Sequence, residues 1–310
     1  MSNLLVGLLG ALVATNQPAA VSNLVKQTTG ISIEVVNPND PIDVAYHKVL
    51  TEDDDARAEV DKWIKEGNAF AEQGAGAPTV TLNARIEQRF AEVKKAYENF
   101  LLKNPSHARA RLAYGCFLNE LGEDYEGSLQ MEKARELDPS NPAAWNNLAN
   151  YYGHRSPVKK SFEYYAKAIE LNPKETTYYW NFATTVYLFR KDAMEFYKID
   201  EQQVFDKALD LYRQALKLDP TNFVLATDYS GSFYGTKPPR YEEGLVAWQN
   251  TLKIARDDIE REGVYVHLAR IEINLGRMDD ARKHLDVITN QMYLNLKSSL
   301  SKKLEKQKSK

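Results

Sequence analysis

Residues 142–175 read PAAWNNLANYYGHRSPVKKSFEYYAKAIELNPKE, and this stretch decides the fold. In its first half, Trp145, Leu148 and Tyr152 recur at spacings of three and four residues, so they share one face of a helix. The second half repeats that spacing at Ser161, Tyr165 and Ala168. Pro173 then ends the second helix, because proline lacks the backbone N–H that would continue it. The stretch therefore predicts two helices joined by a short turn.

The ending of this stretch recurs along the chain. It appears as Leu137-Asp138-Pro139, Leu171-Asn172-Pro173 and Leu218-Asp219-Pro220, with a weaker copy at Lys103-Asn104-Pro105. The weaker copy and the first two full copies follow one another at intervals of 34 residues. That period is typical of helix–turn–helix units that stack on their neighbours. The third full copy comes 13 residues late, which predicts an insertion within residues 188–203.

Neighbouring segments carry the same pattern with some drift. The predicted units lie near residues 108–141, 142–175, 176–222, 223–257 and 262–290. A preceding helix at 84–103 has one apolar stripe and is interpreted as a half-repeat or cap. Residues 84–296 are therefore predicted to form one repeat domain.

Residues 142–175 resemble the tetratricopeptide repeat (TPR) family at about eight positions that align in the same order and spacing. The resemblance extends over about 200 residues of the chain. The whole chain is similar to uncharacterised bacterial TPR proteins. The resemblance implies an all-α fold, a right-handed α-solenoid of stacked helix–turn–helix units. It also implies a concave groove lined by the first helix of each unit. We expect the N-terminal segment to be irregular.

The N-terminal segment, residues 1–20, contains an apolar run at 4–14. The run is shorter than the roughly 20 residues of a membrane-spanning helix, so no integral membrane span is expected. It matches the apolar core of a signal peptide in length, but no basic residue precedes it and no clean cleavage site follows. Two interpretations stay open: an export signal, or a helix packed on the domain. The compartment is open between exported or periplasmic and cytoplasmic.

The segments outside the repeats have distinct compositions. Residues 21–83 are predicted as a preamble with one helix at 53–73, which starts at the acidic cluster 52–55 because carboxylates favour the positive end of a helix dipole. Residues 74–78 are interpreted as a linker. Residues 297–310 hold six lysines and Glu305, and they are predicted to be a solvated, frayed tail. The final helices of the repeats are expected to cap the stack and to carry polar outer faces, which suits this Lys-rich end.

Composition excludes several classes of protein. Hydrophobic residues make up 43% and charged residues 27% of the 310 residues, as in ordinary soluble domains. The net charge of −3 disfavours nucleic-acid binding. Cys116 is the single cysteine, which excludes an internal disulfide and a cysteine-based zinc cluster. Since no phosphate loop, dinucleotide motif or close histidine pair is present, no cofactor, metal or catalytic residue is predicted.

Candidate partner-binding residues come from two places. Positions facing the groove on the first helices are Arg109, Asn119, Asn146, Asn147, Asn150, Trp180, Asn181, Thr184, Thr227, Tyr234 and Arg270. The insertion adds Phe189, Arg190, Phe196 and Tyr197, because inserted loops of repeat proteins often lie on a binding face. Such amide, cationic and aromatic groups suit an extended peptide.

The preferred hypothesis is a non-enzymatic scaffold that binds a protein or extended peptide in the groove. A structural, self-assembling repeat protein is the alternative, in which a homo-oligomer forms through the repeats or the apolar N-terminus. An enzyme of unknown reaction is the third hypothesis, since a fold alone never excludes activity.

Overall fold

The computed structural model describes residues 37, 39–72, 79–155 and 157–308. Within those residues lie fourteen α-helices, two short 3-10 helices and no β-strand, so the all-α prediction is confirmed. None of the described helices is both long and apolar enough to span a bilayer. The chain divides into two compact units, Met1–Tyr151 and Tyr152–Lys310. The predicted segment 1–20 and the linker at 74–78 lie outside the described residues.

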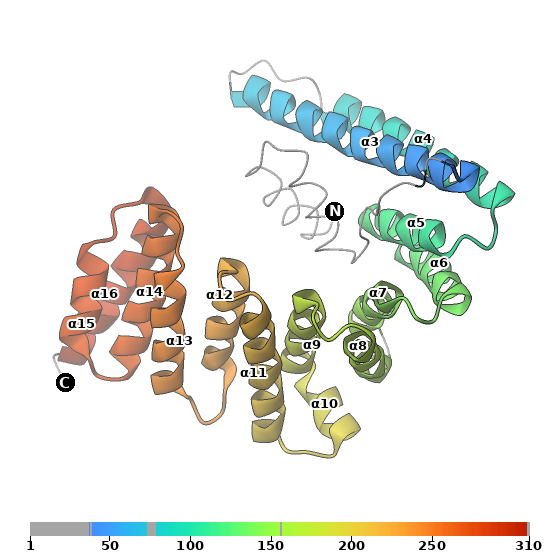
Figure 1. The fold of residues 1–310 in the computed structure, drawn as a ribbon. Helices are drawn as coiled ribbons and strands as arrows, with labels where there is room; N and C mark the ends of the chain where they lie inside the picture. Colours follow the sequence, from blue (N-terminus) through green and yellow to red (C-terminus); the bar gives the residue numbers. More distant parts are fainter. Residues whose placement is uncertain (1–36, 38, 73–78, 156, 309–310) are drawn as a thin grey trace. The chain divides into compact units, whose positions relative to one another are not determined.

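The first unit consists of a long helical hairpin and shorter helices that follow it (Figure 1). Its helices are α3 (Pro41–Glu72), α4 (Thr79–Lys103), α5 (Ala108–Glu120), α6 (Asp124–Leu137) and α7 (Pro142–Gly153), of which α7 crosses the boundary at Tyr151. The helices α3 and α4 lie side by side, and α5 and α6 form the next pair. The predicted unit 108–141 therefore contains one helix pair.

The start of α3 differs from the prediction. Asp40 Oδ1 accepts the N–H of Ile42 at 2.9 Å, and Pro41 occupies the first turn, where its missing N–H costs nothing. The prediction that the acidic cluster 52–55 begins a helix is wrong, because these residues lie in the middle of α3. Asp53 is instead buried, and it accepts hydrogen bonds from Tyr97 and Arg57.

Aromatic rings fill the core between α3, α4 and α5. Tyr97 on α4 stacks on Tyr114 of α5, with ring centroids 5.2 Å apart, and both rings are buried. The pair α5–α6 crosses at two glycines: a Cβ added to Gly115 would lie 2.8 Å from the carbonyl oxygen of Gly127. The absence of side chains at these two positions is what lets the two backbones approach so closely.

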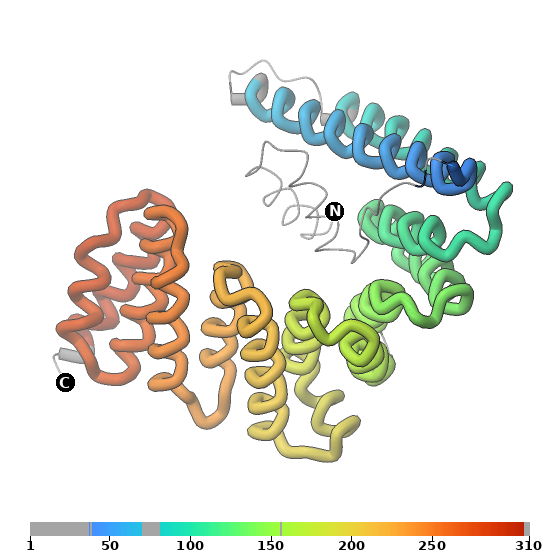
Figure 2. The backbone as a smooth tube through the Cα atoms, in the orientation of Figure 1, coloured from blue at the N-terminus to red at the C-terminus, as the bar shows by residue number. Residues whose placement is uncertain are grey.

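The second unit is a stack of helix pairs whose successive helices alternate in direction (Figure 2). Its helices are α8 (Lys159–Leu171), α9 (Thr176–Leu188), α10 (Arg190–Tyr197), α11 (Glu201–Leu218), α12 (Phe223–Ser232) with η1 (Phe233–Gly235), α13 (Tyr241–Lys253), α14 (Asp258–Asn274), α15 (Met278–Asp286), η2 (Gln291–Tyr293) and α16 (Leu294–Lys308). The first helices of the pairs are α9, α12 and α14, and the second helices are α11, α13 and α15. This stacking confirms the solenoid prediction.

Apolar side chains join each pair to the next. Leu245 and Trp248 on α13 pack in one cluster with Val264, Leu268 and Ile271 on α14. Because a single pair cannot bury its apolar face alone, the stack owes its stability to these contacts between repeats.

The predicted insertion folds as the short helix α10, between α9 and α11. Its last residue is followed by Lys198 in the left-handed region (φ 55°). Asp200 then starts α11: its carboxylate accepts the N–H of Gln203 at 2.8 Å, and the Gln203 side chain accepts the N–H of Asp200. The chain therefore leaves α10 at Lys198 and enters α11 at Asp200.

The prediction of a frayed lysine-rich tail is wrong for residues 297–308. They belong to α16, whose Leu300 and Leu304 are buried in one cluster with Val266 and Leu285. Lys302, Lys303 and Lys306 are exposed, and Lys303 donates to Asn274 Oδ1 at the end of α14 at 2.8 Å. Leucines at a spacing of four supply the apolar stripe that fixes this helix to α14 and α15.

Candidate functional site

The candidate residues divide between the two units. Arg109 and Asn119 on α5, and Asn146, Asn147 and Asn150 on α7, belong to the first unit. Trp180, Asn181 and Thr184 on α9, Thr227 on α12, Tyr234 in η1, Arg270 on α14, and the four insertion residues belong to the second unit.

In the first unit, the candidate side chains hold the fold together. Arg109 donates to Asp43 Oδ1 at 2.7 Å, and its guanidinium lies over the ring of Tyr46. The backbone N–H of Asn37 and the Arg109 guanidinium lower the pKa of Asp43. Asn119 lies against Gly127, with its Oδ1 buried. These contacts join α3 to α5 and α5 to α6.

The prediction that Asn146 and Asn147 face a partner is wrong. Both side chains are buried, at 1% and 5% exposure. Asn146 donates to Asn147 at 3.2 Å, and the Asn147 amide donates to Cys116 Sγ at 3.2 Å. The amides serve the packing of α7 on α5, because buried polar groups need partners inside the protein. Asn150 is half-buried.

In the second unit, the candidate residues of α9 reach toward the following helices. The indole N–H of Trp180 donates to Asp228 Oδ2 on α12 at 2.8 Å, and Thr184 Oγ1 lies 2.9 Å from the Tyr212 hydroxyl on α11. Loss of surrounding water raises the pKa of Asp228, and the hydrogen bond from Trp180 opposes that shift. Trp180 is half-buried, so part of its ring remains accessible.

A second group of aromatic and charged side chains joins η1, α13 and α14. The Tyr234 hydroxyl lies 3.0 Å from His267 Nδ1, and the indole of Trp248 stacks on the His267 ring with centroids 4.1 Å apart. The guanidinium of Arg270 lies over the Tyr234 ring, 5.6 Å from its centroid. Burial, and secondarily the charge of Arg270, lowers the pKa of His267 to about 4.

The lowered pKa of His267 decides which side chain of this cluster carries a charge. At neutral pH the imidazole of His267 is uncharged, so Arg270 carries the positive charge. Arg270 makes no ion pair with any residue that the structure describes. We define the first-helix surface as Trp180, Thr184, Asp228, Tyr234 and Arg270, which lie on α9, α12, η1 and α14.

Sequence reasoning missed Asp228, Trp248 and His267. Asp228 follows the predicted Thr227 and takes the repeat position of Asn147 and Asn181 in the preceding units, so an alignment of the repeats could have indicated it. No comparable sequence signal marks Trp248 and His267 as a stacked pair, because they come from different helices.

The insertion residues pack inward more than predicted. Phe196 and Tyr197 on α10 lie against Phe162 of α8, with ring centroids 5.4 and 5.7 Å apart. The guanidinium of Arg190 lies over Phe205, and Phe189 is half-buried. All four side chains are half-buried, so their role in binding a partner stays a prediction.

No metal centre emerges from the geometry. Within the described part of the chain, no three His, Cys, Asp or Glu side chains gather closely enough to hold a metal ion. The buried carboxylate Glu262 accepts the N–H groups of Thr289 and Asn290 at 2.9 and 2.7 Å. These contacts lower the pKa of Glu262 and fix the turn before η2.

Comparison with known proteins identifies the repeat. A family model described as "Tetratricopeptide repeat" matches residues 142–175, which include α7 and α8. "RNA polymerase-associated protein CTR9" of Caenorhabditis elegans is 26% identical over 141 residues, 44% of this chain and 12% of that protein. A "TPR repeat-containing protein" of Methanocaldococcus jannaschii is 27% identical over 141 residues, 45% of this chain and 21% of that protein. The matched segment thus spans less than a quarter of either relative.

A solved structure extends the likeness of fold. The C-terminal part of a TPR repeat-containing protein from Cytophaga hutchinsonii matches with a TM-score of 0.53 and 12% identity, covering 82% of this chain and 98% of that one. At that identity the likeness concerns the fold alone. The matched model, the stacked helix pairs and the solved structure agree: the chain contains a tetratricopeptide repeat at residues 142–175 within a fold of stacked helix pairs.

Proposed function

We propose that this protein is a non-enzymatic scaffold that binds an extended peptide segment of another protein on its first-helix surface. Repeat proteins commonly use the surface lined by successive helices to bind partners. The observation that carries the proposal is the position of Arg270: its guanidinium lies over Tyr234 and has no ion-pair partner among the described residues. An ordered cation of this kind is ready to receive an acceptor from a partner.

The first-helix surface is continuous across three first helices. Trp180 on α9 donates to Asp228 on α12, and Arg270 on α14 lies over the ring of Tyr234, which follows α12 in η1. Asp228 on α12 accepts hydrogen bonds, and Arg270 on α14 donates them, so the surface offers both polarities to a peptide backbone.

The residue types of this surface are those that supply most of the binding energy at interfaces. Trp, Tyr and Arg are enriched among residues whose truncation costs more than about 2 kcal/mol of binding free energy. Trp180, Tyr234 and Arg270 are each only half-buried. Each is also oriented by a neighbour, so little conformational entropy remains to be lost on binding.

The test is capture of partners from the source lysate by the full chain, read by quantitative mass spectrometry. The variant is Trp180→Ala/Arg270→Ala. Its matched control is Lys217→Ala/Val246→Ala, which removes one exposed cation and one exposed apolar side chain from the second helices α11 and α13. Circular-dichroism melts establish that both variants fold.

We expect a partner that the wild type and the control retain and that the first variant loses. Synthetic segments of that partner then locate the bound peptide. Equal recovery by the folded Trp180→Ala/Arg270→Ala variant would refute binding at the first-helix surface.

A further inference from the structure

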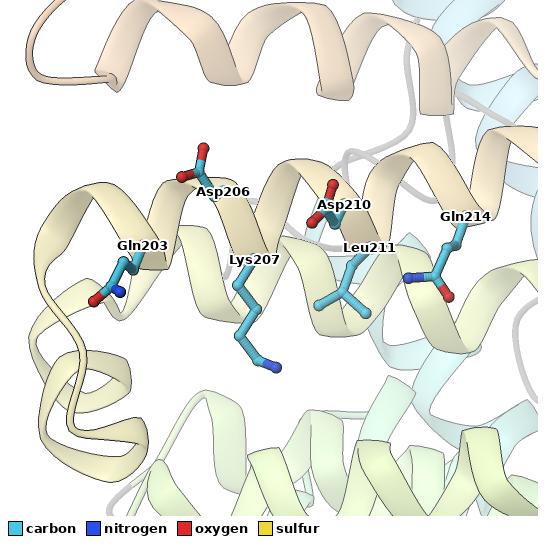
Figure 3. A pocket seen from close by; sticks show the side chains of 6 residues that line it. All are labelled: Gln203, Asp206, Lys207, Asp210, Leu211 and Gln214. Carbon is cyan, nitrogen blue, oxygen red and sulfur yellow. The ribbon is translucent and has the colours of Figure 1, made fainter.

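A pocket of about 410 Å³ lies along α11, a second helix, and so does not belong to the first-helix surface. Its lining residues are Gln203, Asp206, Lys207, Asp210, Leu211 and Gln214. Figure 3 shows that Lys207 and Leu211 point to one side of α11, whereas Asp206 and Asp210 point to the other. The acidic and basic groups of the pocket are thus separated across the helix.

Both aspartates already have cationic partners. Arg240 donates to Asp206 Oδ1 at 2.6 Å, and Arg213 forms an ion pair with Asp210. Their negative charges are therefore largely compensated within the protein. A basic ligand would have to compete with two arginines for these carboxylates.

Lys207, unlike the two aspartates, forms no ion pair with a described residue. Its ammonium lies 4.2 Å from the ring centroid of Tyr197 and 5.9 Å from that of Phe182. It makes neither an ion pair nor a hydrogen bond with any described residue. Half-burial lowers the pKa of Lys207, and the charge of Asp210 opposes that shift. The two aromatic faces hold the ammonium in place, but they leave its charge without an anionic partner.

The same side of α11 continues as a neutral stripe. Leu211 lies one turn beyond Lys207, and Gln214 follows with an exposed amide that makes no hydrogen bond with the described residues. The stripe is about 10 Å long at 1.5 Å per residue. It presents the cation of Lys207 at one end and, beyond the buried Leu211, the Gln214 amide, which can pair with a peptide bond.

We infer that this stripe binds an acidic peptide segment of a partner protein. A side-chain carboxylate of the segment pairs with Lys207, and the peptide backbone pairs with the exposed amide of Gln214. The site uses the segment inserted at α10, because Tyr197 is the ring nearest the ammonium. It is independent of the first-helix surface and stands or falls separately from the proposed function.

The probe is a phage-displayed library of short random peptides, panned on the immobilised full chain. All selections use the Trp180→Ala/Arg270→Ala background, which removes Arg270 as a competing site for acidic peptides. Lys207→Met is added to remove the ammonium while keeping most of the aliphatic chain. The matched control adds Lys217→Met, which removes an exposed lysine from the same helix.

We expect Asp and Glu to be enriched among the selected peptides, and the enrichment to be lost with Lys207→Met and kept with Lys217→Met. For a selected peptide, Lys207→Met and Glu→Gln in the peptide should each weaken binding about 10-fold, as for a charge-assisted contact. Absence of acidic enrichment, or enrichment that survives Lys207→Met, would overturn the inference. Either result leaves the capture experiment on the first-helix surface unaffected.

Discussion

The Tyr97 hydroxyl donates a buried hydrogen bond of 2.8 Å to Asp53 Oδ2, joining α4 to α3 across 44 positions of sequence. The other carboxylate oxygen of Asp53 accepts from Arg57 Nε at 2.8 Å. Arg57 in turn pairs with Glu120 on α5. One carboxylate within the acidic cluster thus connects three helices of the first unit.

Replacing that carboxylate should destabilise the first unit. Asp53→Ala leaves the buried Tyr97 hydroxyl without its acceptor, so we expect a loss of about 2–3 kcal/mol in the free energy of unfolding. Asp55→Ala, at an exposed position of the same cluster, should change it by less than about 0.5 kcal/mol. Urea unfolding followed by circular dichroism measures both. Similar effects of the two substitutions would contradict the role given to Asp53.

The burial of His267 predicts a dependence of stability on pH. Its pKa is about 4 in the folded protein, against 6.5 for a solvated histidine. As pH falls below 6.5, the unfolded chain takes up the proton first, so folding stability decreases until pH 4 and then levels off. Because the ring is partly exposed, we expect the loss between about pH 7 and pH 5 to be about 1 kcal/mol.

The variant His267→Gln should lack this loss of stability on acidification. The variant His154→Gln, at an exposed position, should retain it. Chemical unfolding at both pH values gives the difference between each variant and the wild type. If the wild type and His267→Gln lose the same stability on acidification, His267 is not responsible for the pH dependence of folding.

Two glycines should respond to alanine with opposite signs. In Gly115→Ala the new Cβ would lie 2.7 Å from Met131 Cγ and 2.8 Å from a backbone oxygen, so α5 and α6 must separate. We expect a loss of about 2–3 kcal/mol. A Cβ at Gly231 meets nothing within 4 Å, so Gly231→Ala should stabilise α12 by about 0.5–1 kcal/mol. Thermal melts of the two variants distinguish the signs.

The thiol of Cys116 should be unreactive in the folded protein. Burial raises its pKa to about 12, and only the thiolate attacks disulfide reagents. A chromogenic disulfide reagent at mildly alkaline pH should therefore report no reaction until denaturant is added. The variant Asn147→Ala, which removes the amide bonded to Sγ, provides a comparison. Rapid labelling of the native wild type would show that the Cys116 thiol is reactive in the folded protein and would contradict this prediction.

The repeats could be predicted from sequence because their signals are local. Trp145, Leu148 and Tyr152 mark a face of the first helix by spacing alone, and Pro173 marks the end of the second helix. The 13-residue delay before Pro220 likewise located the insertion that folds as α10. Each of these inferences needs only neighbours within one or two helices.

The misjudged residues depend on contacts between helices far apart in sequence. An aspartate such as Asp53 looks like a helix start until Tyr97 is known to lie beside it. Asparagine is a residue type typical of the protein surface, yet the amide of Asn147 donates to Cys116 Sγ. Trp180 could be proposed as a site residue, but its acceptor Asp228 lies 48 positions away. Helical spacing carries no information about such pairs.

The lysine-rich helix α16 covers an apolar surface of the stack. Its Leu300 and Leu304 occupy the apolar surface of α14 and α15 on which another helix pair could stack. Two copies cannot polymerise through that surface without displacing α16. The exposed face carries Lys302, Lys303 and Lys306, so like charges repel two such ends at low ionic strength. The helix therefore replaces an apolar face of α14 and α15 with a charged, water-compatible surface.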